Sequence, residues 1–156
     1  MQSKVCYEYL SAIGKVYLES DGICLTALKF SVPEGAGVQN AARGDDLIHR
    51  VVGQLDDYFA GARRSFDLPI RLIGTDFQRF VWEALLAIPY GETRSYGQVA
   101  AMIGNPKAAR AVGLANNRNP ISIIVPCHRV IGSNGSLVGY GGGLDAKRYL
   151  LDLENK

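Results

Sequence analysis

The stretch SYGQVAAMIGNPKAARAVGLAN, residues 95–116, decides the fold of the second half of this chain. Ser95 and Gln98 form a capping-box pattern, which predicts a short helix over residues 96–103. A glycine ends that helix, and the Asn-Pro pair after it predicts a second helix over residues 106–116. Two short helices joined by Gly-Asn are the outline of a helix-turn-helix. Such pairs also occur for packing alone, so both interpretations stay open at this point.

The second of these helices is slim and basic. Small residues line it, namely Ala108, Ala109, Ala111, Gly113 and Ala115. Its positive charges are Lys107, Arg110 and Arg118. A slim helix can approach a nucleic-acid groove closely, but small residues also let helices pack tightly in a core.

The residues on either side of this pair predict two more helices. Thr75 and Gln78 form another capping box, which opens a helix that runs to Ile88. Its expected core residues are Phe77, Phe80, Val81, Trp82, Leu85 and Ile88. A closing helix is predicted over residues 145–154, with Ala146, Tyr149, Leu150 and Leu153 facing inward. These elements form a mostly α-helical domain over residues 74–156.

Residues 1–73 predict a separate small α/β domain. Alternating patterns between turn signals predict three short antiparallel strands, at residues 5–10, 15–19 and 23–30. Residues 31–44 are rich in glycine and predict a loop, and residues 45–60 predict an amphipathic helix over the sheet. Residues 66–72 alternate like a strand, but Pro69 confines them to an edge strand or a connector.

The composition is that of a globular protein, with 47% apolar and 21% charged residues. We find no secretory signal and no segment that could span a bilayer, so we expect a cytoplasmic protein without a membrane partner. Three cysteines at irregular spacing argue against a disulfide framework. Residues 1–76 hold 8 Lys/Arg and 10 Asp/Glu, a net charge of −2, whereas residues 77–156 hold 9 and 5, a net charge of +4. This asymmetry permits a polyanionic partner but does not demand one.

A cysteine and a histidine stand side by side in IIVPCHRVI, residues 123–131. We expect a buried extended segment over residues 121–125 that delivers Cys127 and His128. Only a thiolate attacks well, and a free thiol with pKa ~8.5 is mostly protonated at neutral pH. His128 could take the proton across a turn or through a water, although an inert core cysteine is the alternative.

A histidine that accepts a proton usually has its other ring nitrogen oriented by an acceptor. Glu154 and Asp152 at the end of the closing helix are both candidates, and nothing local selects between them.

Metal and phosphate sites are not indicated. The glycines at residues 141–143 lack the Gly-Lys-Ser/Thr ending of a phosphate loop, so a pocket wall is the better interpretation. Cys6, Cys24 and His49 match no compact zinc pattern. We expect no metal and no cofactor.

The pentapeptide Pro126-Cys127-His128-Arg129-Val130 resembles the active-site signature of the O6-alkylguanine-DNA alkyltransferases, also called methylated-DNA–protein-cysteine methyltransferases. Further segments resemble the family in family order: Phe77-Gln78-x-x-Val81-Trp82, Pro89-Tyr90-Gly91-Glu92, Ser95-Tyr96, residues 104–113, Asn119-Pro120, Tyr140-x-Gly142-Gly143-Leu144 and Lys147-x-x-Leu150-Leu151-x-x-Glu154. The resemblance covers most of residues 77–154 and is loose before them. It implies a ribonuclease-H-like α/β domain followed by a helical domain with a helix-turn-helix.

The resemblance implies DNA repair by direct reversal. An alkyl group on O6 of guanine, and also on O4 of thymine, would pass irreversibly to Cys127 after base flipping, once per molecule. His128 would deprotonate Cys127 through a water, Glu154 would polarise His128, Asn119 would hold the active-site turn, and Tyr96 would help to protonate the departing guanine. The guanine pocket would be lined by Trp82, Val130, Tyr140, Gly141 and Gly142. Some members carry Ser where this chain has Gly at 141, which matters little if the backbone N–H makes the contact.

The implied partner is double-stranded DNA, bound by a monomer through the minor groove, which is only ~6 Å wide. Arg110 would enter the base stack and fill the gap left by the flipped nucleotide. The other residues expected to contact DNA are Ser95, Ala108, Ala109, Gly113 and Arg129.

Two other functions compete with this one. A Cys-His hydrolase or amidotransferase using Cys127, His128 and Glu154 would turn over on an amide or ester and would not need a helix-turn-helix. A DNA-binding protein that only flags damage would not need Cys127.

Overall fold

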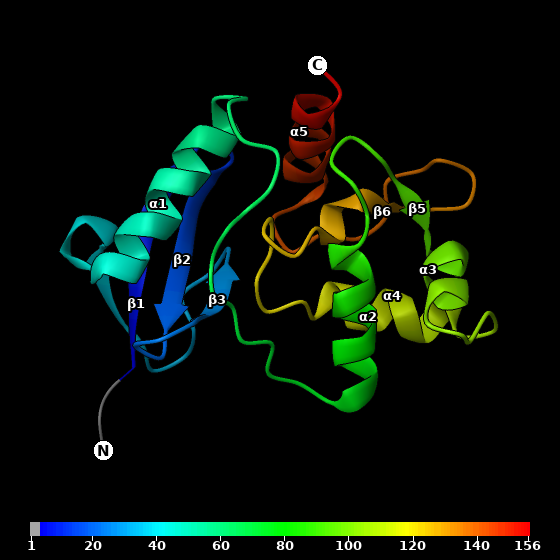
Figure 1. Ribbon diagram of the computed structural model, residues 1–156, viewed down its shortest axis with the longest axis horizontal. Helices are drawn as coiled ribbons and strands as arrows, with labels where there is room; N and C mark the ends of the chain where they lie inside the picture. Colours follow the sequence, from blue (N-terminus) through cyan, green and yellow to red (C-terminus); the bar gives the residue numbers. More distant parts are fainter. Residues whose placement is uncertain (1–3) are drawn as a thin grey trace. The chain divides into compact units, whose positions relative to one another are not determined.

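The computed structural model describes residues 4–156. The chain divides into two compact units, the first ending at Arg71 and the second beginning at Leu72. This division lies two residues before the boundary expected from the sequence. Figure 1 shows the sheet and helix α1 in the first unit and the remaining helices in the second.

The first unit is a four-stranded sheet in the order β3-β2-β1-β4. Its bounds are Val5–Ser11 for β1, Gly14–Ser20 for β2, Leu25–Lys29 for β3 and Gly37–Asn40 for β4. The first three strands are antiparallel, as predicted.

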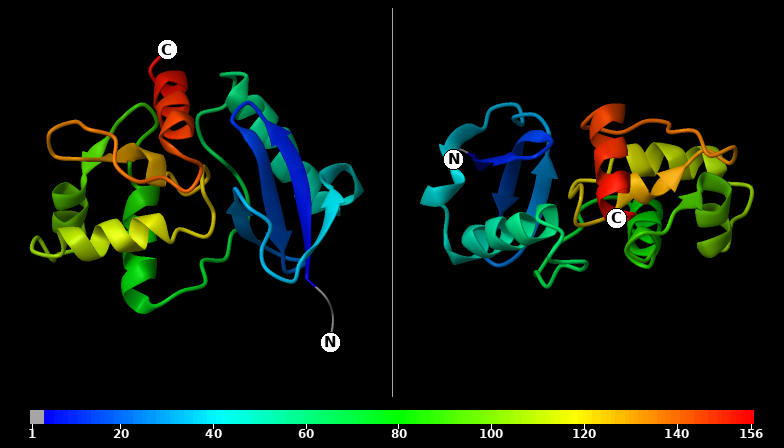
Figure 2. Two further views of the ribbon diagram at one scale, coloured as in Figure 1. Left: turned by 180° about the vertical axis from the view of Figure 1, so that it is seen from behind. Right: turned by 90° about the horizontal axis from the view of Figure 1, so that it is seen from above.

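The fourth strand corrects the sequence-based expectation. β4 pairs parallel with β1, so the sheet is mixed and part of the expected loop at 31–44 is a strand (Figure 2). All four of its residues are exposed. Periodicity gives no signal for such a strand, because no face of it is buried and its place in the sheet comes from backbone pairing with β1.

Helix α1, Asp46–Phe59, covers one face of this sheet (Figure 1). Asp45 caps it by accepting a hydrogen bond from the backbone N–H of Ile48. Its buried residues are Ile48, Val51, Leu55 and Tyr58. A 3₁₀ turn, η1 at Ala41–Arg43, precedes it. After α1, Ile70 forms a single bridge with Leu25, so residues 66–72 are a connector along the sheet edge.

The second unit is mainly helical. Its elements are α2 at Asp76–Leu86, β5 at Arg94–Ser95, α3 at Tyr96–Met102, α4 at Ala109–Asn117, η2 at Cys127–Arg129, β6 at Val130–Ile131 and α5 at Leu144–Glu154. Both predicted capping boxes are present, at the starts of α2 and α3. Helices α2, α3 and α4 pack against one another, and β5 pairs parallel with β6.

Three local expectations about this unit were wrong. Helix α4 begins at Ala109 and not at Pro106, because Asn105 to Ala108 form a turn closed by a 3.0 Å backbone bond, with proline at its second position. Phe80 is 60% exposed and Tyr149 is 42% exposed, so neither belongs to the core.

Within residues 4–156 no helix is both long and apolar enough to cross a bilayer.

Candidate active site

The segment before Cys127 is a buried turn and not the extended segment expected from the sequence. A backbone bond of 3.0 Å runs from the N–H of Val125 to the carbonyl of Ile121. Ile123 inside this turn has φ of 72°, a conformation that costs a β-branched residue about 1–3 kcal/mol.

Asn119 holds this turn closed. Its Nδ2 donates to the carbonyl of Val125 at 2.8 Å, and its Oδ1 accepts from the N–H of Ile121 at 3.0 Å. Both bonds are buried, so the amide offsets part of the strain at Ile123. The predicted role of Asn119 in shaping the turn therefore has a direct geometric basis.

Cys127 begins the 3₁₀ helix η2 and is 4% exposed. A 3₁₀ helix turns by about 120° per residue, so consecutive side chains point in three different directions. Burial is the main influence on the pKa of the Cys127 thiol and raises it. Hydrogen bonds from Asn119 and Ser122 and the charge of Lys147 act in the opposite direction. The thiol thus needs a base to ionise.

His128 is the adjacent base and is fully buried. Its Nε2 donates to Oε2 of Glu154 at 2.7 Å. Burial lowers the pKa of His128, against the opposing effect of Glu154. A neutral imidazole that donates through Nε2 carries its lone pair on Nδ1. Nδ1 is buried and has no hydrogen-bond partner among residues 4–156, which leaves it available as a proton acceptor.

The structure selects Glu154 over Asp152 as the partner of His128. Glu154 is 4% exposed, whereas Asp152 lies on the solvent side of α5. The backbone N–H of Gly91 also donates to Glu154, at 3.3 Å. The carboxylate is therefore held from two directions besides the imidazole, since Arg129 binds it as well.

Arg129 points into the protein. Its Nε donates to Oε1 of Glu154 at 2.8 Å and its Nη2 donates to Oε2 at 3.1 Å, while Nη1 donates to the carbonyl of Ile88 at 2.7 Å. The side chain is buried and fully engaged in the interior. This placement argues against the predicted DNA contact of Arg129, because a guanidinium committed to a buried carboxylate cannot reach a phosphate or a base.

Tyr96 begins α3 and lies near the thiol. Its hydroxyl donates to the carbonyl of Val138 at 3.0 Å. Burial raises the pKa of Tyr96, and the charge of Cys127 raises it further, which places the phenol within electrostatic range of the sulfur. Tyr96 and Cys127 are thus brought together from positions 31 residues apart.

The expected pocket residues divide into two groups. Val130 is buried beside the cysteine, and Tyr140, Gly141 and Gly142 lie in the partly exposed segment before α5. Trp82 instead belongs to the core: it is 1% exposed, and its indole N–H donates to the carbonyl of Ala115 at 2.9 Å. This placement argues against Trp82 as a wall of the guanine pocket.

Apart from Arg129 in η2, the residues expected at DNA lie at the start of α3, on α4 and in the turn between these helices. Arg110 is exposed on α4, and Ala108 and Ala109 are half-buried beside it. A Cβ at Gly113 would lie 3.7 Å from the Tyr96 ring, an ordinary contact distance, so α4 packs closely against the start of α3 here. The hydroxyl of Ser95 accepts from the N–H of Gln98 as the cap of α3.

Two residues of the site were missed by sequence reasoning. Lys147 is fully buried, and its charge acts on Cys127. Ser122 donates a hydrogen bond to the thiol. Lys147 had a signal, because it falls on the same helical stripe as Leu150 and Glu154. Ser122 had none, since a single serine in an apolar run gives no indication that its side chain bonds to a cysteine five residues later.

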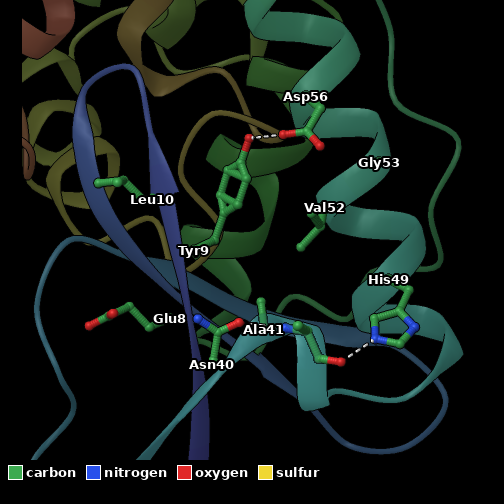
Figure 3. Close-up of a pocket in the computed structure, with 10 residues that line it drawn as sticks. Glu8, Tyr9, Leu10, Asn40, Ala41, His49, Val52, Gly53 and Asp56 are labelled. Carbon is green, nitrogen blue, oxygen red and sulfur yellow. Dashed lines mark hydrogen bonds between the residues drawn. The ribbon is translucent and has the colours of Figure 1, made fainter.

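The first unit holds a cavity of about 490 Å³ between β1, η1 and α1 (Figure 3). The hydroxyl of Tyr9 donates to Asp56, and Nε2 of His49 donates to the carbonyl of Ala42 at 3.0 Å. These polar groups join the elements of the unit to one another. Within the described residues no three or more His, Cys, Asp or Glu side chains gather as a metal site.

Comparison with known proteins identifies the family. The ribonuclease-like domain of 6-O-methylguanine DNA methyltransferase matches residues 5–72, and the DNA-binding domain of the same family matches residues 76–156. A methylated-DNA–protein-cysteine methyltransferase of Methanosarcina acetivorans is 52% identical over 151 residues, which cover 92% of this chain and 94% of the relative. One of Mycobacterium leprae is 52% identical over 155 residues, which cover 96% and 91%. The crystal structure of Mycobacterium tuberculosis OGT in complex with DNA has a TM-score of 0.88 and 51% identity, over 97% of this chain and 92% of that one. The chain belongs to the 6-O-methylguanine DNA methyltransferase family.

Proposed function

We propose that this protein repairs DNA by direct reversal, moving the alkyl group of O6-alkylguanine, and of O4-alkylthymine, onto Cys127. The observation that carries the proposal is the buried bond between His128 and Glu154, which leaves Nδ1 of His128 as a proton acceptor next in sequence to the buried Cys127. Relatives of 52% identity are named for transfer to a protein cysteine, which supports the same reaction here.

The thiol must first lose its proton. His128 takes it on Nδ1, through a water molecule, and Glu154 stabilises the resulting imidazolium through the 2.7 Å bond. Arg129 keeps Glu154 oriented through two bonds. Proton transfer to His128 gives the thiolate a route of formation although burial raises the pKa of the thiol.

The thiolate then attacks the alkyl carbon in line. A C–S bond forms as the C–O6 bond breaks, and the electron pair of the broken bond goes to the guanine. Tyr96 donates a hydrogen bond or proton to the departing base, and the proton first removed from Cys127 balances the reaction. The products are guanine and S-alkylcysteine.

The reaction ends with a thioether. A thioether has no good leaving group, and Cys127 is the one cysteine of the second unit, whose residues are all described. We infer one alkyl transfer per molecule. We place the reaction in the cytoplasm, where thiols stay reduced; the three cysteines are free.

The lesion must leave the duplex before the sulfur can reach it. Base extrusion costs a few kcal/mol and is easier for a poorly paired base. Helix α4 presents small residues and the exposed Arg110, which suits entry into the minor groove and replacement of the flipped base. A homologous structure contains DNA, which supports duplex DNA as the partner.

Mass spectrometry after incubation with O6-methylguanine duplex tests the proposal. We expect one added methyl group on the Cys127 peptide and no more than one product per protein molecule. Cys127→Ser should bind the duplex but carry no methyl, because a hydroxyl is far harder to ionise. Many products per molecule, or methyl on another residue, would contradict the proposal.

A further inference from the structure

Lys147 on α5 is fully buried, although lysine is almost never buried without a partner. Its Nζ donates to the carbonyl of Val138 at 2.9 Å and to that of Gly139 at 3.3 Å. Both acceptors are neutral. A buried cation on neutral carbonyls is costly, so its position needs an explanation beyond packing.

The charged groups around Lys147 explain why a buried cation is useful at this position. Helix α5, which carries Lys147, packs against η2, which begins at Cys127, so both residues belong to one buried contact region. Cys127 raises the pKa of Lys147, against the larger effect of burial, and Lys147 in turn lowers the pKa of Cys127 and that of His128. The ammonium therefore favours the thiolate and disfavours the imidazolium before the reaction. Arg129 and Glu154 also face His128, with opposite effects on its pKa.

Lys147 shares one acceptor with Tyr96. The carbonyl of Val138 accepts from the Tyr96 hydroxyl at 3.0 Å and from Lys147 at 2.9 Å. A carbonyl oxygen has two lone pairs and can serve both donors. If the phenol turns to a guanine, the carbonyl keeps the ammonium as its donor and is not left unsatisfied.

We propose that Lys147 is a positioning residue of the alkyl-transfer site: it anchors the backbone at Val138 and Gly139 so that Tyr96 can exchange Val138 for the guanine, and it presents a positive charge to Cys127. The role in releasing Tyr96 rests on the proposed function. The role toward Cys127 does not, because it concerns the free protein.

The first experiment measures the thiol without DNA. Iodoacetamide modification of the Cys127 peptide is followed across pH in the wild type, Lys147→Met and Lys147→Arg, each checked for folding by circular dichroism. We expect the midpoint to rise by about one pH unit in Lys147→Met, which is about a tenfold lower thiolate fraction, and to return toward the wild type in Lys147→Arg. Arg148→Met is the matched control, since it removes an exposed cation from the adjacent position of α5.

Lys147→Gln keeps the experiment decisive if Lys147→Met does not fold. The glutamine amide can still donate to Val138 but carries no charge. It should show the same shift of the iodoacetamide profile. A wild-type profile in a folded Lys147→Met or Lys147→Gln overturns the charge role.

The second experiment tests the exchange by Tyr96. Single-turnover rates on methylated duplex are measured for Lys147→Met, Tyr96→Phe and the double variant. Because both residues act through Val138, the double variant should lose less than the product of the two single losses. A double variant whose rate loss equals the product of the two single losses would overturn the proposal that Tyr96 exchanges Val138 for the guanine. A wild type that transfers no methyl at all would instead refute the proposed function and leave the iodoacetamide result standing.

Discussion

Glu154 and His128, 26 positions apart, are joined by a buried 2.7 Å hydrogen bond from Nε2 to Oε2. This single contact determines which nitrogen of the imidazole carries the proton and which one can accept the proton of the thiol. It also places a carboxylate where the imidazolium would form.

Replacing Glu154 by glutamine should slow transfer strongly, and folding of the variant is checked by circular dichroism because the substitution also removes the buried counter-charge of Arg129. An amide cannot stabilise an imidazolium as a carboxylate does, so we expect the single-turnover rate on methylated duplex to fall about 100-fold or more. Asp152→Asn on the exposed side of α5 is the matched control and should stay within about twofold of the wild type. Equal losses in both variants would rule out the assigned role of Glu154.

Burial of His128 should make the protein less stable in acid. The pKa of His128 is lowered in the folded state from an ordinary value of 6.5, so below pH 6.5 the unfolded chain binds a proton that the folded chain does not. The free energy of unfolding should therefore fall by about 1.4 kcal/mol per pH unit, from pH 6.5 down to the lowered pKa.

Urea unfolding of the wild type and of His128→Gln, at several pH values on both sides of 6.5, measures this contribution. The free energy of unfolding should fall less steeply with decreasing pH in His128→Gln than in the wild type. His49→Gln, which alters an exposed histidine, should keep the dependence of the wild type. An unchanged slope in His128→Gln would show that the acid sensitivity arises elsewhere.

Arg129→Met should destabilise the protein while leaving its salt-dependent binding of DNA intact. The substitution leaves Glu154 buried and without its guanidinium partner, which costs about 3–5 kcal/mol when a buried pair is broken from one side. Chemical denaturation measures the loss. A reduced slope of log affinity against log salt would instead mean that Arg129 contacts phosphate after all.

Arg110→Ala should weaken repair of duplex far more than reaction with the free base O6-benzylguanine. Arg110 is exposed on α4 and takes no part in the buried bond between His128 and Glu154, so the reaction of Cys127 with a free base should be unaffected. Parallel single-turnover measurements on the two substrates provide the comparison. Similar losses on both would exclude a role in base flipping.

Gly74→Ala should lower stability through a clash with the core tryptophan. A Cβ at Gly74 would lie 2.5 Å from Cη2 of Trp82, whose ring is fixed by its bond to Ala115. We expect a loss of about 1–3 kcal/mol, measured by thermal or urea unfolding. Gly53→Ala in α1 meets nothing within 4 Å and should instead stabilise by about 0.5–1 kcal/mol.

The sequence by itself determined the elements whose signals are local. The capping boxes at Thr75 and Ser95 predicted the starts of α2 and α3, because a side chain and a backbone N–H three residues apart decide where such a helix begins. The stripe of apolar residues predicted α1, and the adjacency of Cys127 and His128 pointed to thiol chemistry.

Only the tertiary structure decided what depends on residues far apart in the chain. Strand β4 exists because it pairs with β1, and Glu154 was distinguished from Asp152 because only one of them faces η2. The inward turn of Arg129 likewise depends on Ile88 and Glu154, 41 and 25 positions away. Local sequence patterns do not predict such partners, since the same charged residue type can face solvent or pair with a buried counter-charge.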